Sequence, residues 1–215
     1  MNNWAVFAAA FGVTAALLFS TLAANIYSKE PLFKPYWEDQ AARQAIMANA
    51  SKIGIRAGSG PQGVVIVGYK DALGAPNRAE LLTTLRQLLD AASGYTVYLT
   101  PWADDNATRA YLALLYEGRL TLQEYLQGVV KNETASSPRV DQALSLANYV
   151  AAAYRYQGTN YVPTPPIYVV VYRNDTTYVV YEPFTPGRDQ NYADWFQWVK
   201  TALENLRQGQ GKTTP

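Results

Sequence analysis

The chain has 215 residues, 49% of them hydrophobic, with 18 basic and 17 acidic side chains and neither histidine nor cysteine. Without imidazole or thiol groups it cannot build a Ser–His–Asp triad, a cysteine nucleophile, a disulfide or a thiolate metal site. The apolar content is that of a folded chain, and the near-neutral charge argues against a nucleic-acid binder that works by charge.

The N-terminal segment has the properties of a membrane span. The first 28 residues contain no charged side chain, and residues 4–26 are uninterrupted and largely apolar. As a helix this stretch would be about 35 Å long, enough to cross a bilayer core. Trp4 and Tyr27 stand where interfacial aromatic residues belong. We therefore expect a transmembrane anchor over residues 1–28. The alternative is a secretory signal cleaved near residue 24, which the lack of a preceding basic residue disfavours.

Two signals disagree about the side of the membrane. Lys29 and Lys34 follow the span, which weakly favours a cytoplasmic domain. Asn-x-Ser/Thr sequons, which suit a glycosylated outer surface, begin at Asn49, Asn106, Asn132 and Asn174. We expect a single-pass membrane protein whose C-terminal part is extracytoplasmic, in an archaeal or eukaryotic cell. The lack of cysteine and the low methionine content lean towards a thermophile.

The rest of the chain reads as one α/β domain with a leading segment. A linker and a helix are expected over residues 29–57, followed by the folded domain over residues 58–206. The unbroken run Val64–Val67 predicts a strand buried on both faces. Asn77 and Glu80 then have the spacing of a helix cap, ahead of leucines on one helical stripe.

The later elements continue this pattern. Thr96–Leu99 predicts a second strand, and a block of helices follows, in which Thr121 and Glu124 match a capping box. The block ends with a helix that opens at Ser137-Pro138. The remaining expected elements are a hairpin, a last helix and a flexible tail, at residues 167–181, 192–206 and 207–215 respectively.

Asp104 and Asp105 invite comparison with a calcium site or a catalytic carboxylate pair. No calcium-loop spacing follows them, and adjacent carboxylates rarely face each other across a cleft. We interpret them as the start of a helix, whose dipole they complement.

Tyr168 and Tyr172 share one face of the expected hairpin. They either pack beneath the last helix or form an exposed aromatic surface for a partner. Packing is favoured, because the last helix needs a surface to cover.

Two segments resemble a known family. Gly60–Asp71 is similar to the first-strand region of the DsbA-like thiol oxidoreductases, where the stretch ends in an aromatic residue, one residue and an aspartate. Val162–Pro165, followed by Ile167–Val170, resembles the Thr-Pro loop of the same family. The resemblance covers residues 58–206. It implies an α/β, thioredoxin-like fold with a helical insertion (DsbA-like), which the N-terminal transmembrane helix expected above would precede.

The resemblance also implies that the redox site is lost. The family's Cys-Pro-x-Cys motif falls on Gly74–Asn77, or two residues earlier with Ala72 and Ala75 at the thiol positions, and neither register contains cysteine. On this match Pro165 is the candidate cis-proline, and the backbone of Thr164 would pair with an extended peptide. The former active-site surface would then comprise Asp71, Gly74, Asn77, Thr164 and Pro165. The plainer alternatives are a loop that ends in a helix cap and an all-trans strand entry.

These patterns lead to two hypotheses of different kinds. The first is a non-catalytic, membrane-anchored binding, scaffold or accessory subunit of a membrane or surface assembly. Its partners would be other membrane or surface proteins, with residues 4–26 in the membrane. The alternative is a self-assembling filament or coat subunit, a homo-oligomer with the apolar N-terminal helix as its core. Under either hypothesis we expect no catalytic residue, no cofactor, no metal and no nucleic-acid partner.

Overall fold

The computed structural model describes residues 32–35, 40–154, 164–174 and 178–208. Its strands are β1 (Leu32–Pro35), β2 (Ile55–Gly58), β3 (Gly63–Lys70), β4 (Thr96–Trp102), β5 (Ile167–Arg173) and β6 (Tyr178–Pro183). Its helices are α2 (Gln40–Ile53), α3 (Arg78–Ala91), α4 (Asn106–Tyr116), α5 (Leu122–Leu126), α6 (Arg139–Ala153) and α7 (Tyr192–Arg207). The expected anchor and the last seven residues of the expected tail lie outside these ranges. No helix within them is both long and apolar enough to cross a bilayer.

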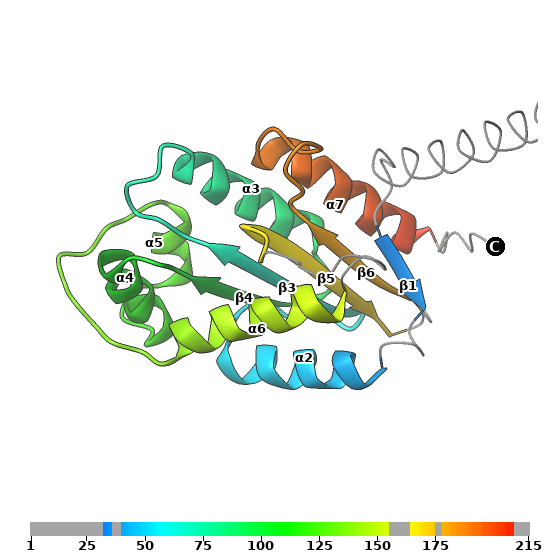
Figure 1. Ribbon diagram of the computed structural model, residues 1–215, viewed down its shortest axis with the longest axis horizontal. Coiled ribbons are helices and arrows are strands. Elements are labelled where there is room, and N and C mark those ends of the chain that lie inside the picture. The colour runs from blue at the N-terminus through cyan, green and yellow to red at the C-terminus, as the bar shows by residue number, and fades with distance from the viewer. Residues whose placement is uncertain (1–31, 36–39, 155–163, 175–177, 209–215) are drawn as a thin grey trace, which may run out of the picture. The chain divides into compact units, whose positions relative to one another are not determined.

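The strands form one mixed sheet in the order β1-β6-β5-β3-β4-β2 (Figure 1). Strands β3 and β4 are parallel and are joined through α3, while β5 is antiparallel to β3 and β6 is antiparallel to β5. A β-α-β unit, a helix, a hairpin and a final helix, with inner strands ordered β6-β5-β3-β4, constitute the thioredoxin fold. The expected thioredoxin-like α/β fold is therefore confirmed by strand order and direction, and α4 and α5 form the helical insertion between β4 and α6.

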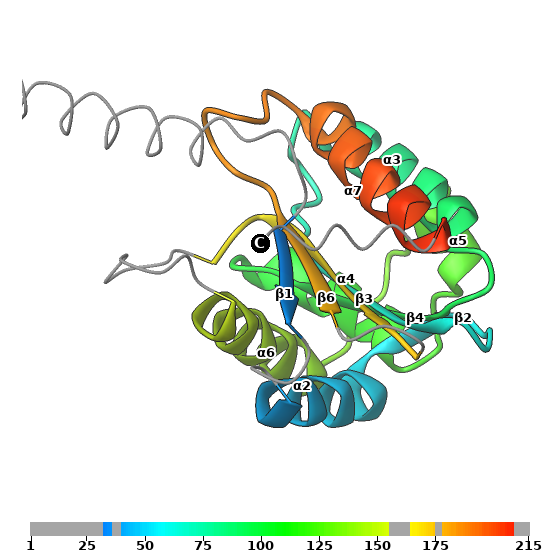
Figure 2. The same cartoon turned by 90° about the vertical axis from the view of Figure 1, so that its right-hand side faces the viewer.

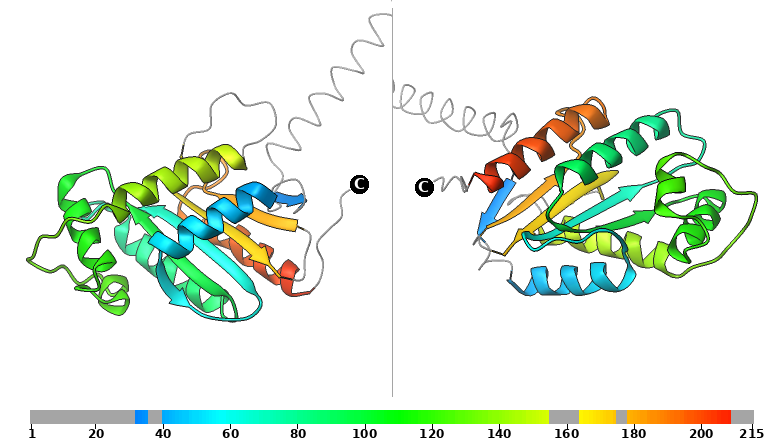
Figure 3. Two further views of the ribbon diagram at one scale, coloured as in Figure 1. Left: turned by 90° about the horizontal axis from the view of Figure 1, so that it is seen from below. Right: turned by 180° about the vertical axis from the view of Figure 1, so that it is seen from behind.

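Helices cover both faces of the sheet. On one face α3 packs beside α7, and on the other α2 packs beside α6 (Figures 2 and 3). Because both faces are covered, the central strand must be apolar throughout rather than alternating. Strand β3 meets this requirement, since Val65, Ile66, Val67 and Tyr69 are fully buried.

Gly68, in the middle of β3, is required by a close approach of the neighbouring strand. A Cβ atom at this position would overlap the ring of Tyr168 from β5. The ring occupies the space that a side chain would need, so that only glycine fits here.

Tyr168 and Tyr172 of the hairpin are buried, but not beneath the last helix. The hydroxyl of Tyr172 lies 2.6 Å from that of Tyr154, the residue that follows α6, and the rings of Tyr168 and Trp102 are stacked with centroids 6.2 Å apart. Arg43 of α2 also lies over the Tyr172 ring. The two tyrosines therefore pack in the core as expected, but the expectation that α7 covers them is wrong, because they lie on the face of the sheet that α2 and α6 cover. Helix α7 covers the opposite face, where Trp195 donates a hydrogen bond to the Glu182 carbonyl.

Local signals placed several helix starts correctly. Asp105 caps α4 by accepting a hydrogen bond of 2.8 Å from the Thr108 amide, as the interpretation of Asp104 and Asp105 predicts. The capping box of Thr121 and Glu124 is also present at the start of α5.

The two edge strands are not predicted by the sequence. Strand β1 lies within the expected linker, and β2 follows the expected first helix, which itself begins only at Gln40. Both strands have four residues, and β1 ends in a proline. Such short segments carry little periodic signal. Residues 32–35 and 55–58 therefore belong to the sheet rather than to connecting chain.

Candidate functional site

The segments that the resemblance pairs lie next to each other at one end of the sheet. The Lys70 amide, at the end of β3, donates a hydrogen bond of 2.7 Å to the Pro166 carbonyl, just before β5. The loop of residues 71–77 then leads into α3. The carboxyl end of the central strand is thus bonded to the proline-rich entry of β5.

A small hollow opens between these segments. It has a volume of about 180 Å³. Its lining comes from the β3–α3 connection, the first turn of α3, the entry of β5 and the start of α7: Lys70, Ala72, Ala75, Asn77, Arg78, Leu81, Pro166 and Tyr192. Two other hollows, of about 210 and 430 Å³, lie beside α6 and touch none of these residues.

Asp71, which the resemblance places on the binding surface, is instead fully buried. Its carboxylate forms a two-point ion pair with Arg78, with Nε to Oδ1 at 2.8 Å and Nη2 to Oδ2 at 3.2 Å. The Tyr125 hydroxyl donates to Oδ2 at 2.9 Å and the Ala72 amide to Oδ1 at 2.8 Å. The two carboxylate oxygens therefore accept four hydrogen bonds, and these bonds tie the start of the loop to the first residue of α3 and to α5.

Arg78 is the first residue of α3 and is held among aromatic rings. Its guanidinium carbon lies 5.2 Å from the Tyr111 ring centroid and 5.7 Å from that of Tyr125. Burial alone would lower the pKa of this guanidinium, but the hydrogen bond and charge of Asp71 outweigh it and the pKa is raised. Burial also raises the pKa of the neighbouring Tyr125 well above its usual value. The cluster thus places a buried ion pair beside a buried phenol.

Gly74 and Asn77 lie in the loop between β3 and α3. Gly74 is exposed, and a Cβ atom there would have nothing within 4 Å. Asn77 precedes α3, but its side chain makes no cap hydrogen bond, and the Glu80 carboxylate accepts from the Ala193 amide of α7 instead. The predicted capping pair is therefore wrong, because a tertiary contact takes the glutamate. Of the five residues expected at the site, Asn77 alone lines the hollow.

Thr164 and Pro165 lie at the entry to β5. The Thr164 hydroxyl donates to the side-chain oxygen of Asn148 in α6. Pro165 is buried. No cis peptide bond occurs among the described residues, so that the Thr164–Pro165 bond is trans and the expectation of a cis-proline is wrong. Most X–Pro peptide bonds in folded proteins are trans, and this bond follows that general preference rather than the Thr-Pro loop of the family that the sequence resembles.

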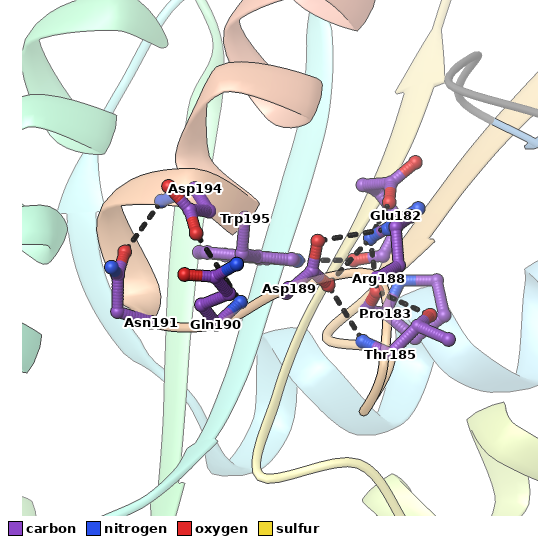
Figure 4. Close-up of polar contacts among 9 residues, drawn as sticks. All are labelled: Glu182, Pro183, Thr185, Arg188, Asp189, Gln190, Asn191, Asp194 and Trp195. Atoms are coloured by element: carbon purple, nitrogen blue, oxygen red, sulfur yellow. Dashed lines mark hydrogen bonds and ion pairs between the residues drawn. The ribbon is translucent and has the colours of Figure 1, made fainter. Parts of the chain in front are cut away.

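A second polar cluster, which the sequence does not predict, joins the end of β6 to the loop before α7 (Figure 4). Glu182 at the end of β6 is fully buried, and its Oε1 lies 2.5 Å from Nη2 of Arg188. The same Nη2 is 2.8 Å from Oδ2 of Asp189, which also accepts from the Thr185 amide at 2.7 Å. This cluster ties together the loop that leads into α7, whose first residue, Tyr192, lines the hollow.

The four sequon asparagines are all exposed, but in different settings. Asn49 lies within α2, Asn106 opens α4, Asn132 lies in the loop between α5 and α6, and Asn174 follows β5. Across the part of the chain that the structure describes, no three acidic side chains gather as metal ligands would.

Comparisons with known proteins do not assign the chain to a family. No family model matches the chain, and no curated protein matches it. Among solved structures, the chain is similar to Proteus mirabilis ScsC in a compact conformation, with 13% sequence identity and a TM-score of 0.44. The match covers 97% of this chain and 98% of that one. By the order and direction of its own strands, the chain is a thioredoxin-like α/β protein with a helical insertion, and it has no cysteine from which a thiol–disulfide active site could be made.

Proposed function

We propose that this protein is a non-catalytic, membrane-anchored, extracytoplasmic thioredoxin-like protein that serves as a binding or accessory subunit of a membrane or surface assembly. It would bind an extended segment of a partner protein at the hollow between the first turn of α3 and the entry of β5. The observation that carries the proposal is this hollow, framed by a closed loop where the family's thiols would stand.

The chemistry of the hollow suits an apolar side chain. Leu81, Pro166 and Tyr192 supply carbon surface, and Ala72 and Ala75 leave room. Its two cations are already engaged, Arg78 with Asp71 and Lys70 with Asp104, so that they would gain little from an acidic ligand. A volume of about 180 Å³ is below the roughly 300–1,000 Å³ of small-molecule pockets. One anchoring side chain of a peptide is therefore a better fit than a cofactor, and backbone pairing at the strand entry would add affinity.

The proposed lack of thiol–disulfide catalysis rests on the residues available. A mixed disulfide needs a thiol, and the chain contains none. The charged groups closest to the hollow form ion pairs, Arg78 with Asp71 and Lys70 with Asp104. An insulin-reduction assay with the chain alone should therefore give the blank rate, and turnover would contradict this part of the proposal.

Site-specific photo-cross-linking in native membranes tests the binding site. A photoreactive amino acid replaces Ala75 at the hollow, and the control places it at Ser93, an exposed turn residue after α3. We expect a discrete adduct with another membrane or surface protein from position 75 only. Equal adducts from both positions, or none from position 75, would overturn the proposed site. Adducts of the chain with itself, together with long polymers after detergent extraction, would instead support the filament hypothesis.

A further inference from the structure

The four sequons differ in how accessible the folded structure leaves their asparagine amides and hydroxyl groups. Attachment of an N-linked glycan forms a bond between the sugar anomeric carbon and the asparagine Nδ2. It breaks the bond from that carbon to the diphosphate of a lipid-linked oligosaccharide donor and releases the lipid diphosphate and one amide proton. The transferase therefore needs access to Nδ2 and to the hydroxyl two residues later, in a segment that can leave regular structure.

The Asn49 sequon is locked within a helix. Nδ2 of Asn49 donates a hydrogen bond of 2.8 Å to the Ala45 carbonyl, and the Ser51 hydroxyl donates to the Ala48 carbonyl at 3.0 Å. Ala50 between them is fully buried against the core. Modification here would require α2 to unfold locally.

The Asn106 sequon is blocked at its hydroxyl. Thr108 is 1% exposed, and its hydroxyl accepts a hydrogen bond of 3.1 Å from the Leu73 amide. Its own amide donates to the Asp105 cap. A transferase cannot reach this hydroxyl while the first turn of α4 is in place.

Asn174 uses the reacting nitrogen to hold two turns together. Its Nδ2 donates a hydrogen bond of 2.8 Å to the Pro61 carbonyl, and its amide donates to the Gln62 carbonyl at 3.1 Å. A glycan on this nitrogen would compete with the contact that joins the end of β5 to the turn before β3.

The sequon at Asn132 has none of these restraints. Asn132, Glu133 and Thr134 are all exposed, and they lie outside helices and strands. The loop that contains them runs around the outside of α4 and α5 (Figure 1). The Glu133 carboxylate is 2.5 Å from Nη2 of Arg119, which holds the middle of the sequon at the surface.

We propose that Asn132 is the glycan acceptor of the folded protein and that the other three sequons stay unmodified. In cells this rests on the extracytoplasmic location proposed above. The selection among sequons, in contrast, follows from the fold alone. The two can therefore be tested apart.

The test uses the full chain, purified in detergent without glycans, with an oligosaccharyltransferase and a lipid-linked oligosaccharide. Intact mass spectrometry should show one added glycan on the folded chain. Asn132→Gln and Thr134→Ala should remove it, and Ser51→Ala should keep it. Peptides from a digest of the same chain, given to the same enzyme, should be modified at every sequon, because nothing then protects them.

Three results would overturn the proposal. The first is a glycan at Asn49, Asn106 or Asn174 of the folded chain, and the second is the absence of a glycan at Asn132 of the folded chain. The third is that the transferase does not glycosylate the digested peptide that contains Asn132. If the purified chain is glycosylated at Asn132 alone but protein from its own cells carries no glycan, the proposed extracytoplasmic location is contradicted. The proposed preference for Asn132 among the four sequons would still stand.

Discussion

The Tyr125 hydroxyl, in the helical insertion, donates a hydrogen bond of 2.9 Å to Oδ2 of Asp71 at the end of the central strand. Both residues are fully buried, and they lie 54 positions apart in the chain. Together with Arg78, they join the sheet, the first turn of α3 and the insertion in one network. The loop beside the hollow is thereby built as a rigid structural element.

Removal of the Tyr125 hydroxyl should therefore destabilise the fold without changing its shape. Tyr125→Phe leaves one oxygen of a buried carboxylate short of a donor, which costs about 1–3 kcal/mol. Denaturant unfolding followed by tryptophan fluorescence measures the difference. Tyr149→Phe is the matched control, because Tyr149 is 45% exposed and should be replaced at no cost. Equal midpoints for the two variants would contradict the role assigned to Tyr125.

The ion pair of Asp71 and Arg78 should show strong coupling in a double-mutant cycle. Arg78→Met leaves the buried carboxylate unpaired and should cost about 3–5 kcal/mol. Asp71→Asn in addition should recover part of that loss, because no unpaired charge remains. The free energies of unfolding of the two single variants and the double variant give the coupling. Additive losses would mean that the two side chains do not depend on each other.

Glycine should be essential at position 68 and dispensable at position 74. In Gly68→Ala the new Cβ overlaps the Tyr168 ring, and the strain should lower stability by about 1–3 kcal/mol. Gly74→Ala meets nothing within 4 Å and serves as the control. Thermal unfolding of the two variants checks the difference. A stable Gly68→Ala protein would show that the ring of Tyr168 lies elsewhere.

The Asp105 cap of α4 should make the stability of the protein depend on pH in the acidic range. Hydrogen bonds from the backbone and side chain of Thr108 lower the pKa of Asp105 below its ordinary value of 3.8. A carboxylate with a lowered folded pKa stabilises the fold above the unfolded value, and this contribution is lost as the pH falls through the folded pKa. Asp105→Asn keeps a capping side chain but not the titration. The Tm of the natural protein should thus exceed that of the variant near neutral pH and converge with it in strong acid. A constant difference would exclude the carboxylate as its source.

Local patterns predicted those parts of the fold whose signals lie within a few residues. The buried run in β3, the cap at Asp105 and the capping box at Thr121 depend on near neighbours and are found as predicted. Glu80 does not take its predicted capping role, because its partner, the Ala193 amide, is 113 positions away in the chain. Glu182 and Arg188 are close in the chain, but both look like ordinary surface charges in the sequence, and no local motif marks the burial of Glu182 that makes their ion pair structural.

The residues around the hollow divide in the same way, into those that a local sequence motif marks and those that only tertiary packing brings there. The β3–α3 loop and the entry to β5 were recognisable because each has its own motif. Tyr192 could not be assigned to the site, since only the packing of α7 beside α3 brings it there. Asp71 was recognisable as a marked position, but its burial depends on Tyr125 and Arg78, which no local pattern links to it.

Filling the hollow tests most directly whether the protein works by contact at this place. Ala75→Trp introduces a bulky side chain into the hollow, and Ser93→Trp places the same side chain on the exposed turn after α3. Each full-length variant is extracted from its own membranes, and co-purifying proteins are quantified against the natural chain after equal Tm values confirm folding. We predict that Ala75→Trp loses its partner by at least about tenfold, equivalent to about 1.4 kcal/mol, while Ser93→Trp retains it. Full retention by Ala75→Trp would contradict the account.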